Sequence, residues 1–193
     1  SLGPFGLDVV GSRAYVACEG ENGQSVLDIV ELDTQQVVSS VALGEVVASL
    51  GDEPWGPDVL VFGSRVYVSN NQESGKVLIV DLSSTPPAVT GSINTGGRPQ
   101  EMVLDEQSAR IYVLDKRNPA GVTVIDGFSS SRLSSIEIAG RTDLPRALAL
   151  IPQTAFGRKL LVMGYYQDVV FYDLDLGLVV GEIVVTDDIN SIA

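Results

Sequence analysis

The chain has 193 residues and a formal net charge of −13, from 12 Lys and Arg against 25 Asp and Glu. Because such a surface repels phosphate groups, the charge argues against a general nucleic-acid binder and against docking on anionic membranes. The absence of His and the single Cys exclude His-based catalytic arrangements, His-ligated zinc and an internal disulfide within this chain. No apolar run reaches the roughly 18 residues of a membrane helix, so no membrane insertion is expected.

Four segments of the chain repeat one order of features. Each opens with a proline and continues with a short apolar run, a turn and a second apolar run. The prolines are Pro4, Pro54, Pro99 and Pro145. The first runs are Leu7–Val10, Val59–Phe62, Met102–Leu104 and Ala147–Ile151. The second runs, taken as equivalent to one another, are Ala14–Cys18, Val66–Asn70, Ile111–Asp115 and Leu160–Gly164.

A third run in each segment ends on an acid, and a fourth, more polar run follows. The acids are Glu31, Asp81, Asp126 and Asp173. The fourth runs are Val37–Val41, Val89–Ile93, Leu133–Ile138 and Val179–Val185. Since the prolines and the acids keep the same spacing, the segments are repeats. A residue that recurs in every repeat serves structure better than catalysis, so we expect the acids to cap turns and Tyr15, Tyr67 and Tyr112 to pack between repeats.

The repeats predict an all-β protein. Short runs rich in Val, Ile and Tyr between turn residues are typical of strands, and no helical periodicity is sustained. Four short strands every 45 to 50 residues are typical of the four-stranded antiparallel blades of a β-propeller. One blade cannot cover both faces of its own sheet, so it must pack against neighbouring blades.

The sequence resembles the YVTN-type β-propeller repeats, a WD40-like group. Tyr67-Val68-Ser69-Asn70 is close to the Tyr-Val-Thr-Asn signature, Ile79-Val80-Asp81 and Val124-Ile125-Asp126 match the end of the third strand, and Gly96-Gly97-Arg98-Pro99 matches the step into the next blade. The first and fourth repeats depart from this pattern. The resemblance implies the fold and says little about activity.

We expect one partial propeller domain over residues 1–193. Its blades span approximately residues 4–53, 54–98, 99–144 and 145–188, and residues 189–193 begin a fifth repeat. Such repeats usually close with about seven blades, which favours a piece of a larger ring. The alternative is a small closed ring, or a half-ring that associates with itself through exposed apolar blade faces.

The rim formed by the loops after second strands and between blades is the expected binding surface. Arginines near blade entries are suited to clamp a carboxylate or phosphate, and Trp55 is suited to line the channel mouth. The predicted ligand-binding residues are Arg98, Arg141, Arg146, Asn70, Asp115 and Trp55. Solvated or locally paired arginines are the competing interpretation.

The sequence gives weaker indications of a metal site or a reactive thiol. Asp187, Asp188 and Asn190 form an oxygen-rich group that suits Ca²⁺, although turn chemistry explains the same residues. Apart from Ca²⁺, no cofactor is predicted. Cys18 has no His to activate it, so a passive thiol is expected.

These features predict a non-catalytic scaffold or recognition module that binds a protein or a surface polymer through the rim. The resemblance implies an extracytoplasmic location: periplasmic, secreted or at the cell surface. The alternative is a propeller enzyme, either a lactonase-like hydrolase or a cofactor-dependent oxidoreductase, with an acid and Asn metal site in the channel. Asp115, Asn70 and the 187–190 segment would supply that site.

Overall fold

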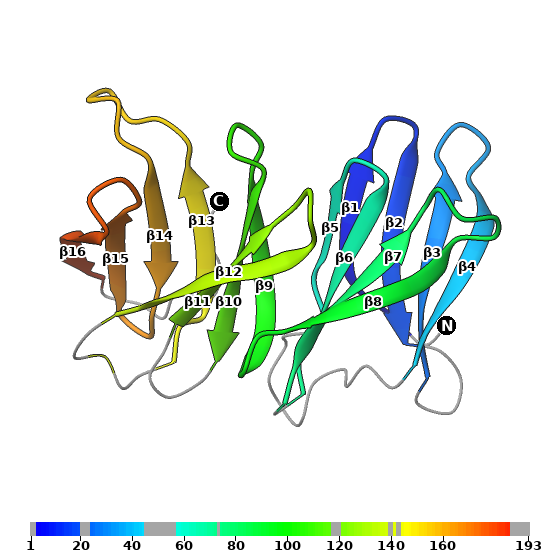
Figure 1. Ribbon diagram of the computed structural model, residues 1–193, viewed down its shortest axis with the longest axis horizontal. Helices are drawn as coiled ribbons and strands as arrows, with labels where there is room; N and C mark the ends of the chain where they lie inside the picture. The colour runs from blue at the N-terminus through cyan, green and yellow to red at the C-terminus, as the bar shows by residue number, and fades with distance from the viewer. Residues whose placement is uncertain are drawn as a thin grey trace. The chain divides into compact units, whose positions relative to one another are not determined.

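A computed structural model describes residues 3–19, 24–44, 57–72, 74–116, 121–138, 141 and 144–185 (Figure 1). These residues form sixteen β-strands. The strands are four to nine residues long and rich in β-branched and aromatic side chains, which fit a pleated, half-buried surface. Within the described part of the chain, no helix is long and apolar enough to cross a membrane.

The strands form four antiparallel sheets, each with its four strands in chain order. The first sheet contains β1 (Gly3–Val10), β2 (Arg13–Glu19), β3 (Ser25–Glu31) and β4 (Gln36–Gly44). The second contains β5 (Val59–Phe62), β6 (Arg65–Asn70), β7 (Lys76–Asp81) and β8 (Ala88–Asn94). The third contains β9 (Arg98–Asp105), β10 (Arg110–Lys116), β11 (Gly121–Asp126) and β12 (Ser131–Glu137). The fourth contains β13 (Ala147–Ile151), β14 (Leu160–Gly164), β15 (Asp168–Asp173) and β16 (Leu178–Val184).

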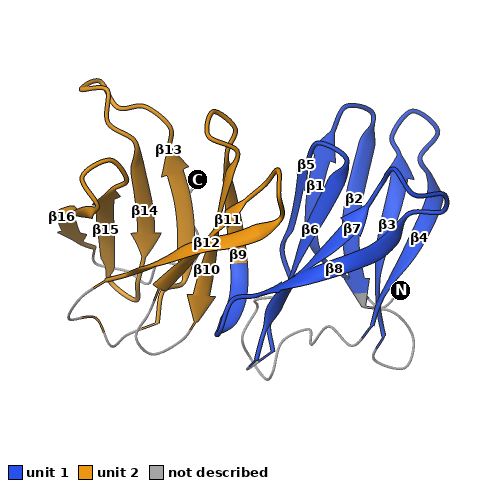
Figure 2. Cartoon of the chain, in the orientation of Figure 1, with its two compact units in different colours: residues 1–100 blue, residues 101–193 orange. Residues whose placement is uncertain are grey.

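The chain divides into two compact units, residues 1–100 and residues 101–193, coloured separately in Figure 2. Unit 1 holds the first and second sheets. Unit 2 holds the third and fourth sheets, apart from the first residues of β9.

The predicted strand pattern is confirmed, with one correction of register. All four third strands end on the predicted acids Glu31, Asp81, Asp126 and Asp173. In the fourth sheet, however, Leu160 pairs with Asp173, as Arg65 pairs with Asp81 in the second sheet. Leu161, rather than Leu160, is therefore the equivalent of Val66. The predicted alignment was one residue out because repeat four lacks the Tyr that marks the position elsewhere.

In unit 1, two sheets pack face to face through apolar side chains. We call the face of a sheet that packs on the following sheet its forward face, and the face that packs on the preceding sheet its backward face. The forward face of the first sheet consists of Tyr15, Ala17, Leu27, Ile29, Val41 and Leu43. The backward face of the second sheet consists of Val59, Val61, Val66, Val68, Leu78 and Val80. Because side chains alternate along a strand, each sheet presents two such faces.

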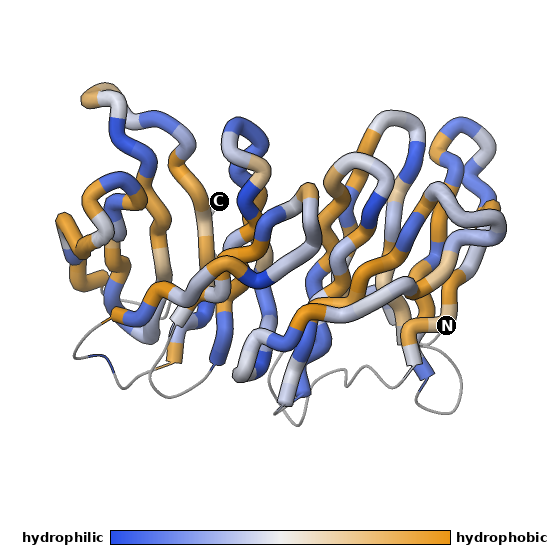
Figure 3. Tube along the Cα trace, in the orientation of Figure 1, coloured by the Kyte–Doolittle hydropathy of each residue, from blue (hydrophilic) through white to orange (hydrophobic). Residues whose placement is uncertain are grey.

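Unit 2 has an equivalent core. The third sheet contributes Tyr112, Leu114, Val122, Val124 and Ile138, and the fourth contributes Leu148, Leu161, Met163, Tyr165 and Val170. Figure 3 shows hydrophobic stretches along the strands and hydrophilic residues in many, though not all, of the turns. Burial of Tyr15, Tyr67 and Tyr112 confirms that the recurring tyrosines pack inside the protein.

Hydrogen bonds from one first strand to the next fix the sheets in both units. In unit 1, the backbone N–H of Val61 on β5 donates to Asp8 Oδ2 on β1 at 2.7 Å. In unit 2, the backbone N–H of Leu148 on β13 donates to Glu101 Oε2 on β9. Gly6 on β1 lies so close to the second sheet that a Cβ there would overlap the Pro57 carbonyl oxygen. The first strands therefore carry both polar and steric constraints on sheet packing.

Three of the repeated acids, Asp81, Asp126 and Asp173, cap the turn that follows their strand, as predicted, whereas Glu31 bonds to side chains of the β1–β2 turn. Asp126 Oδ1 accepts hydrogen bonds from the Ser129 N–H at 2.7 Å and from its hydroxyl at 2.9 Å, and these bonds lower the pKa of Asp126. Asp81 makes the same pair of bonds to Ser83, which lowers its pKa. Asp173 accepts from the N–H groups of residues 175 and 176. Hydrogen bonds from Ser12 and Arg13 lower the pKa of Glu31.

Candidate functional site: the strand-end rim

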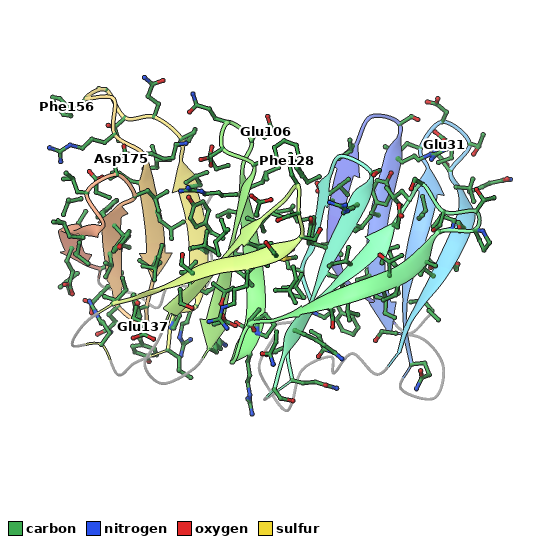
Figure 4. All side chains as sticks on the ribbon, in the orientation of Figure 1. Glu31, Glu106, Phe128, Glu137, Phe156 and Asp175 are labelled. Carbon is green, nitrogen blue, oxygen red and sulfur yellow. The ribbon has the colours of Figure 1, made fainter. Side chains whose placement is uncertain are left out.

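The described residues that were predicted to bind ligands lie at one end of each sheet. In an antiparallel sheet, the first and third strands begin at the end of the sheet where the second and fourth strands finish. We call this end of the sheets the rim. Figure 4 labels Glu137, which ends β12 at the rim of unit 2, and Phe156 and Asp175, which lie in turns at the opposite end of that unit.

At the rim of unit 1, Asn70 shapes the turn that follows β6. Its side chain is buried, and Oδ1 accepts a hydrogen bond from the Gln72 N–H at 3.2 Å. The backbone oxygen of Asn70 also accepts from this N–H, at 2.8 Å. Because the amide is buried and engaged within its own turn, the geometry gives Asn70 a structural role and leaves ligand binding as a prediction.

The β6–β7 loop packs tightly on the residues that lead into β9. The Gly75 N–H donates to the Gly97 carbonyl at 2.8 Å, and the Thr95 N–H donates to the Gly75 carbonyl at 3.3 Å. A Cβ at Gly75 would overlap Pro99 and lie 2.5 Å from the carbonyl oxygen of Asn70. Arg98, which begins β9 immediately afterwards, is half-buried. Its backbone is therefore held in place, while its predicted role in anion binding stays a prediction.

In unit 2, Asp115 occupies the position at the end of β10 that Asn70 occupies at the end of β6. It is completely buried, and the Thr123 hydroxyl donates to its Oδ2 at 2.5 Å. Cys18 holds the same position in the first sheet and is also buried. With the corrected register, Tyr165 holds it in the fourth sheet. The position is therefore an internal one whose polarity varies from sheet to sheet.

Arg141 is the most strongly engaged of the predicted arginines. Its Nη1 lies 2.6 Å from Asp168 Oδ2, and its Nη2 is paired with Glu182 on β16. The guanidinium also lies over the Tyr165 ring, 4.6 Å from the centroid. Two carboxylates thus balance the charge of Arg141. Arg141 is therefore paired, as the competing interpretation expected, but with acids of the fourth sheet rather than with neighbours in the sequence. Ligand binding by Arg141 stays a prediction.

Arg146 is different, because it makes no ion pair with any residue that the structure describes. Its guanidinium lies 4.9 Å from the ring centroid of Tyr166, a side chain that is 49% exposed. The Tyr165 N–H donates to the Asp168 carbonyl at 2.7 Å, which closes a two-residue hairpin turn with Tyr166 at its tip. Arg146 and Tyr166, called the rim pair below, therefore present a cation and an aromatic ring on ordered backbone.

Tyr166 was not among the predicted binding residues. It lies in the loop after the second strand of repeat four, a loop that the sequence placed in the rim without singling out a residue. The dipeptide Tyr165-Tyr166 after an apolar run was the available signal. One tyrosine is buried under Arg141 and the other is exposed beside Arg146.

A cavity of about 970 Å³ lies at the other end of unit 2, along the first strands of both sheets. Its walls include Val103, Leu148 and Leu150, with Glu101, Asp105 and Glu106 among its polar groups. Asp105 is paired with Lys159, and Glu101 accepts the Leu148 N–H, so both carboxylates hold the two sheets together. This cavity was not predicted from the sequence, since its residues come from two repeats.

The remaining predicted residues, Trp55, Asp187, Asp188 and Asn190, lie outside the described part of the chain. Within the described part, no three Cys, Asp or Glu side chains group to hold a metal ion. Calcium binding by the 187–190 segment therefore stays a prediction. Asp173 and Asp175, another pair of acids, belong to a capped turn.

No family model and no curated protein matches the sequence. Solved structures do match. A chain of hydrazine synthase from Kuenenia stuttgartiensis has a TM-score of 0.71 at 20% identity, covering 95% of this chain and 49% of that one. A chain of a mitotic checkpoint complex gives 0.70 at 14% identity, with coverages of 96% and 52%. Apo AztD from Citrobacter koseri gives 0.55 at 15% identity, with coverages of 96% and 47%.

The chain thus spans about half the length of the structures it matches. At these identities the likeness concerns the fold alone. The matched structures are β-propellers or propeller-like, and they share with this chain the succession of four-stranded antiparallel sheets. The YVTN type is not confirmed. By its fold, the chain is an all-β protein built from four β-propeller blades.

Proposed function

We propose that the chain is a non-catalytic recognition module that binds a protein through the rim, with the rim pair at the centre of the contact. Arg and Tyr are enriched among the residues that dominate binding energy at protein interfaces. The observation that carries this proposal is the contact of the half-buried Arg146 guanidinium with the exposed ring of Tyr166, which lies at the tip of a tight turn. The stacking keeps the guanidinium close to the ring, so little side-chain freedom is lost on binding.

The chemistry of the rim pair favours a partner that offers a carboxylate next to an apolar group. The guanidinium can donate two parallel hydrogen bonds to a carboxylate, and the exposed ring can cover the apolar group. Leu144, two residues before Arg146, adds an exposed apolar side chain. A matched propeller chain comes from a multi-protein complex, which supports a protein partner for this fold. A surface polymer is the other partner class.

Burial of Asn70 and Asp115 supports binding over the enzymatic alternative. Both residues were candidates for an acid and Asn metal site, and both use side-chain oxygens in internal hydrogen bonds. We also propose an extracytoplasmic location, which rests on the resemblance of the repeats alone. Cell fractionation with an antibody against the chain tests the location independently of binding.

Affinity capture from an extract of the producing organism tests the binding proposal. The double variant Arg146→Ala with Tyr166→Ala is compared with a control double variant, Arg132→Ala with Phe156→Ala. The control also removes one cation and one exposed aromatic ring from unit 2, but Phe156 lies away from the rim. Loss of a captured protein with the rim variant alone supports the proposal. Equal capture by both variants refutes it.

A further inference from the structure

The fourth sheet carries a complete forward face that no described residue of a following sheet covers. Cross-strand pairing aligns it with the buried forward face of the first sheet, because Val162 pairs with Phe171 and Val169 with Ile183, as Tyr15 pairs with Ile29 and Leu27 with Val41. Its members are Val162, Val169, Phe171, Ile183 and Val185. All are apolar. Val162 is buried, but Ile183 is 54% exposed, and Val169, Phe171 and Val185 are only half-buried.

The first sheet carries a backward face in the same condition. Leu7 pairs with Val16 and Val9 with Ala14, as Val59 pairs with Val68 and Val61 with Val66 in the buried backward face of the second sheet. The members of this face are Leu7, Val9, Ala14, Val16, Asp28 and Val30. Leu7 is 58% and Val9 51% exposed, whereas Val59 and Val61 are buried.

One residue in this backward face is charged. Asp28 stands where the second sheet has the buried Leu78, and its Oδ1 accepts a hydrogen bond from the Ser40 hydroxyl at 2.5 Å. Covering this face costs part of the hydration of one carboxylate, although the Ser40 hydrogen bond is kept. Any association through the face should therefore be weaker than the packing of the second sheet on the first.

We propose that a second copy of this chain covers both faces: the forward face of the fourth sheet in each copy packs on the backward face of the first sheet in the other. The proposal is independent of the rim pair. The two faces are the two halves of one kind of interface, and that interface is already formed by equivalent residues between the first and second sheets. Two copies supply eight sheets, within the range of roughly four to eight blades in propellers.

The lengths of the matched structures point the same way, because each is about twice as long as this chain. A pair formed in this way has two-fold symmetry, and each copy uses both faces once. Further sheets on the same polypeptide are the other conceivable cover. The 193-residue chain distinguishes the two, since only a second copy can cover the faces when this chain is purified alone.

Light scattering coupled to size-exclusion chromatography, with sedimentation velocity over a concentration series, measures the association. We expect the wild-type chain to reach twice its 20.4 kDa mass. Ile183→Glu in the forward face or Val9→Glu in the backward face should weaken dimerisation by about 100-fold or more, because each buries an unpaired charge. Phe156→Glu is the control, since it adds the same charge to an 89% exposed turn residue outside both faces. Circular dichroism confirms that each variant is folded.

Mixing the two face variants gives the sharpest test. Ile183→Glu retains an intact backward face and Val9→Glu an intact forward face, so an equimolar mixture can form one interface while neither variant alone can form any. We expect a two-chain complex in the mixture only. A further variant, Asp28→Leu, should dimerise more tightly than the wild type, because it restores the residue type that the second sheet has at this position. A wild-type monomer at all concentrations, growth beyond two chains, or a mixture that stays monomeric would overturn the proposal.

Discussion

The ion pair between Asp105 and Lys159 should be a main determinant of the stability of unit 2. Asp105 ends β9 in the third sheet and Lys159 precedes β14 in the fourth, so the pair connects two blades. The Asp105 side chain is 2% exposed and that of Lys159 is 17% exposed. Oδ2 of Asp105 also accepts from the Ser108 hydroxyl at 2.5 Å, and Oδ1 accepts from the Gln107 N–H at 3.2 Å.

Asp105→Asn should lower the free energy of unfolding by about 2–3 kcal/mol. Removing one partner of a buried pair costs roughly 3–5 kcal/mol, and the partial exposure of Lys159 reduces this, because its ammonium can recover water. Lys159→Met keeps the aliphatic stem and should cost about 1.5–3 kcal/mol, the contribution of a hydrogen bond to a charged group. Arg158→Met is the matched control: Arg158 is mostly exposed and 3.8 Å from Asp173, so it should cost less than about 1 kcal/mol.

The pair should also produce a specific pH dependence. Burial raises the pKa of Asp105, but hydrogen bonds from Lys159 and Ser108 outweigh burial and leave the pKa below its usual value. A lowered pKa in the folded state stabilises the fold above the unfolded pKa of about 3.9, and this contribution is lost as the pH falls through the folded pKa. The difference between wild type and Asp105→Asn should therefore be largest near neutral pH and shrink in acid.

Urea denaturation followed by circular dichroism, at neutral and acidic pH, measures these effects for the wild type, both single variants and the double variant. Since the residues are in direct contact, the double variant should be less destabilised than the sum of the single variants by about 1 kcal/mol or more. Strictly additive effects, or a difference that does not change with pH, would refute the reasoning.

Three further predictions concern packing and turns. Gly6→Ala should lower the melting temperature, because the new Cβ would lie 2.9 Å from Asp58 Cα. Gly3→Ala is the control and should leave the melting temperature unchanged, since a Cβ at Gly3 has nothing within 4 Å. Equal melting temperatures for the two variants would contradict this packing. Leu161→Ala should cost about 2–5 kcal/mol in urea denaturation, against less than about 1 kcal/mol for the exposed Leu176→Ala, and similar costs would place Leu161 outside the core. A nuclear magnetic resonance titration should find the pKa of Asp126 below that of an exposed Asp, and Ser129→Ala should raise it towards the ordinary value.

The local sequence pattern of each repeat was sufficient to predict most of the fold. Glu31, Asp81, Asp126 and Asp173 ended their strands as predicted. The three aspartates do so because a turn needs an acceptor for its free N–H groups wherever it occurs. Two of the four first strands, β1 and β9, were predicted too short. Gly3 and Pro4 are poor strand formers by propensity, yet they belong to β1, where they pair with Glu19 and Cys18 of β2. In the same way, β9 already begins at Arg98.

The site could be predicted only in part, since its chemistry depends on which side chains meet. Arg141 and Arg146 look alike in the sequence. Among the described residues, however, Asp168 and Glu182 pair with Arg141, while Arg146 has no ion pair and lies against the ring of Tyr166. Those acids come from 27 and 41 residues further along the chain. No residue close to either arginine in the sequence indicates that Arg141 is paired with acids and Arg146 is stacked on a ring. The positions of Asn70 and Asp115 were likewise identified correctly as equivalent, while their burial followed from packing.

Because Cys18 is buried, the reactivity of its thiol reports the local opening of the first sheet. Cys18 is the sole thiol in the chain, it lies in the first sheet, and its side chain is shielded in the native state. A thiol reagent can therefore modify the protein only after β2 has opened locally or unit 1 has unfolded. The rate of thiol modification in the native protein, divided by the rate in the urea-unfolded protein, measures how often this one blade opens. The measurement needs no label and no engineered probe.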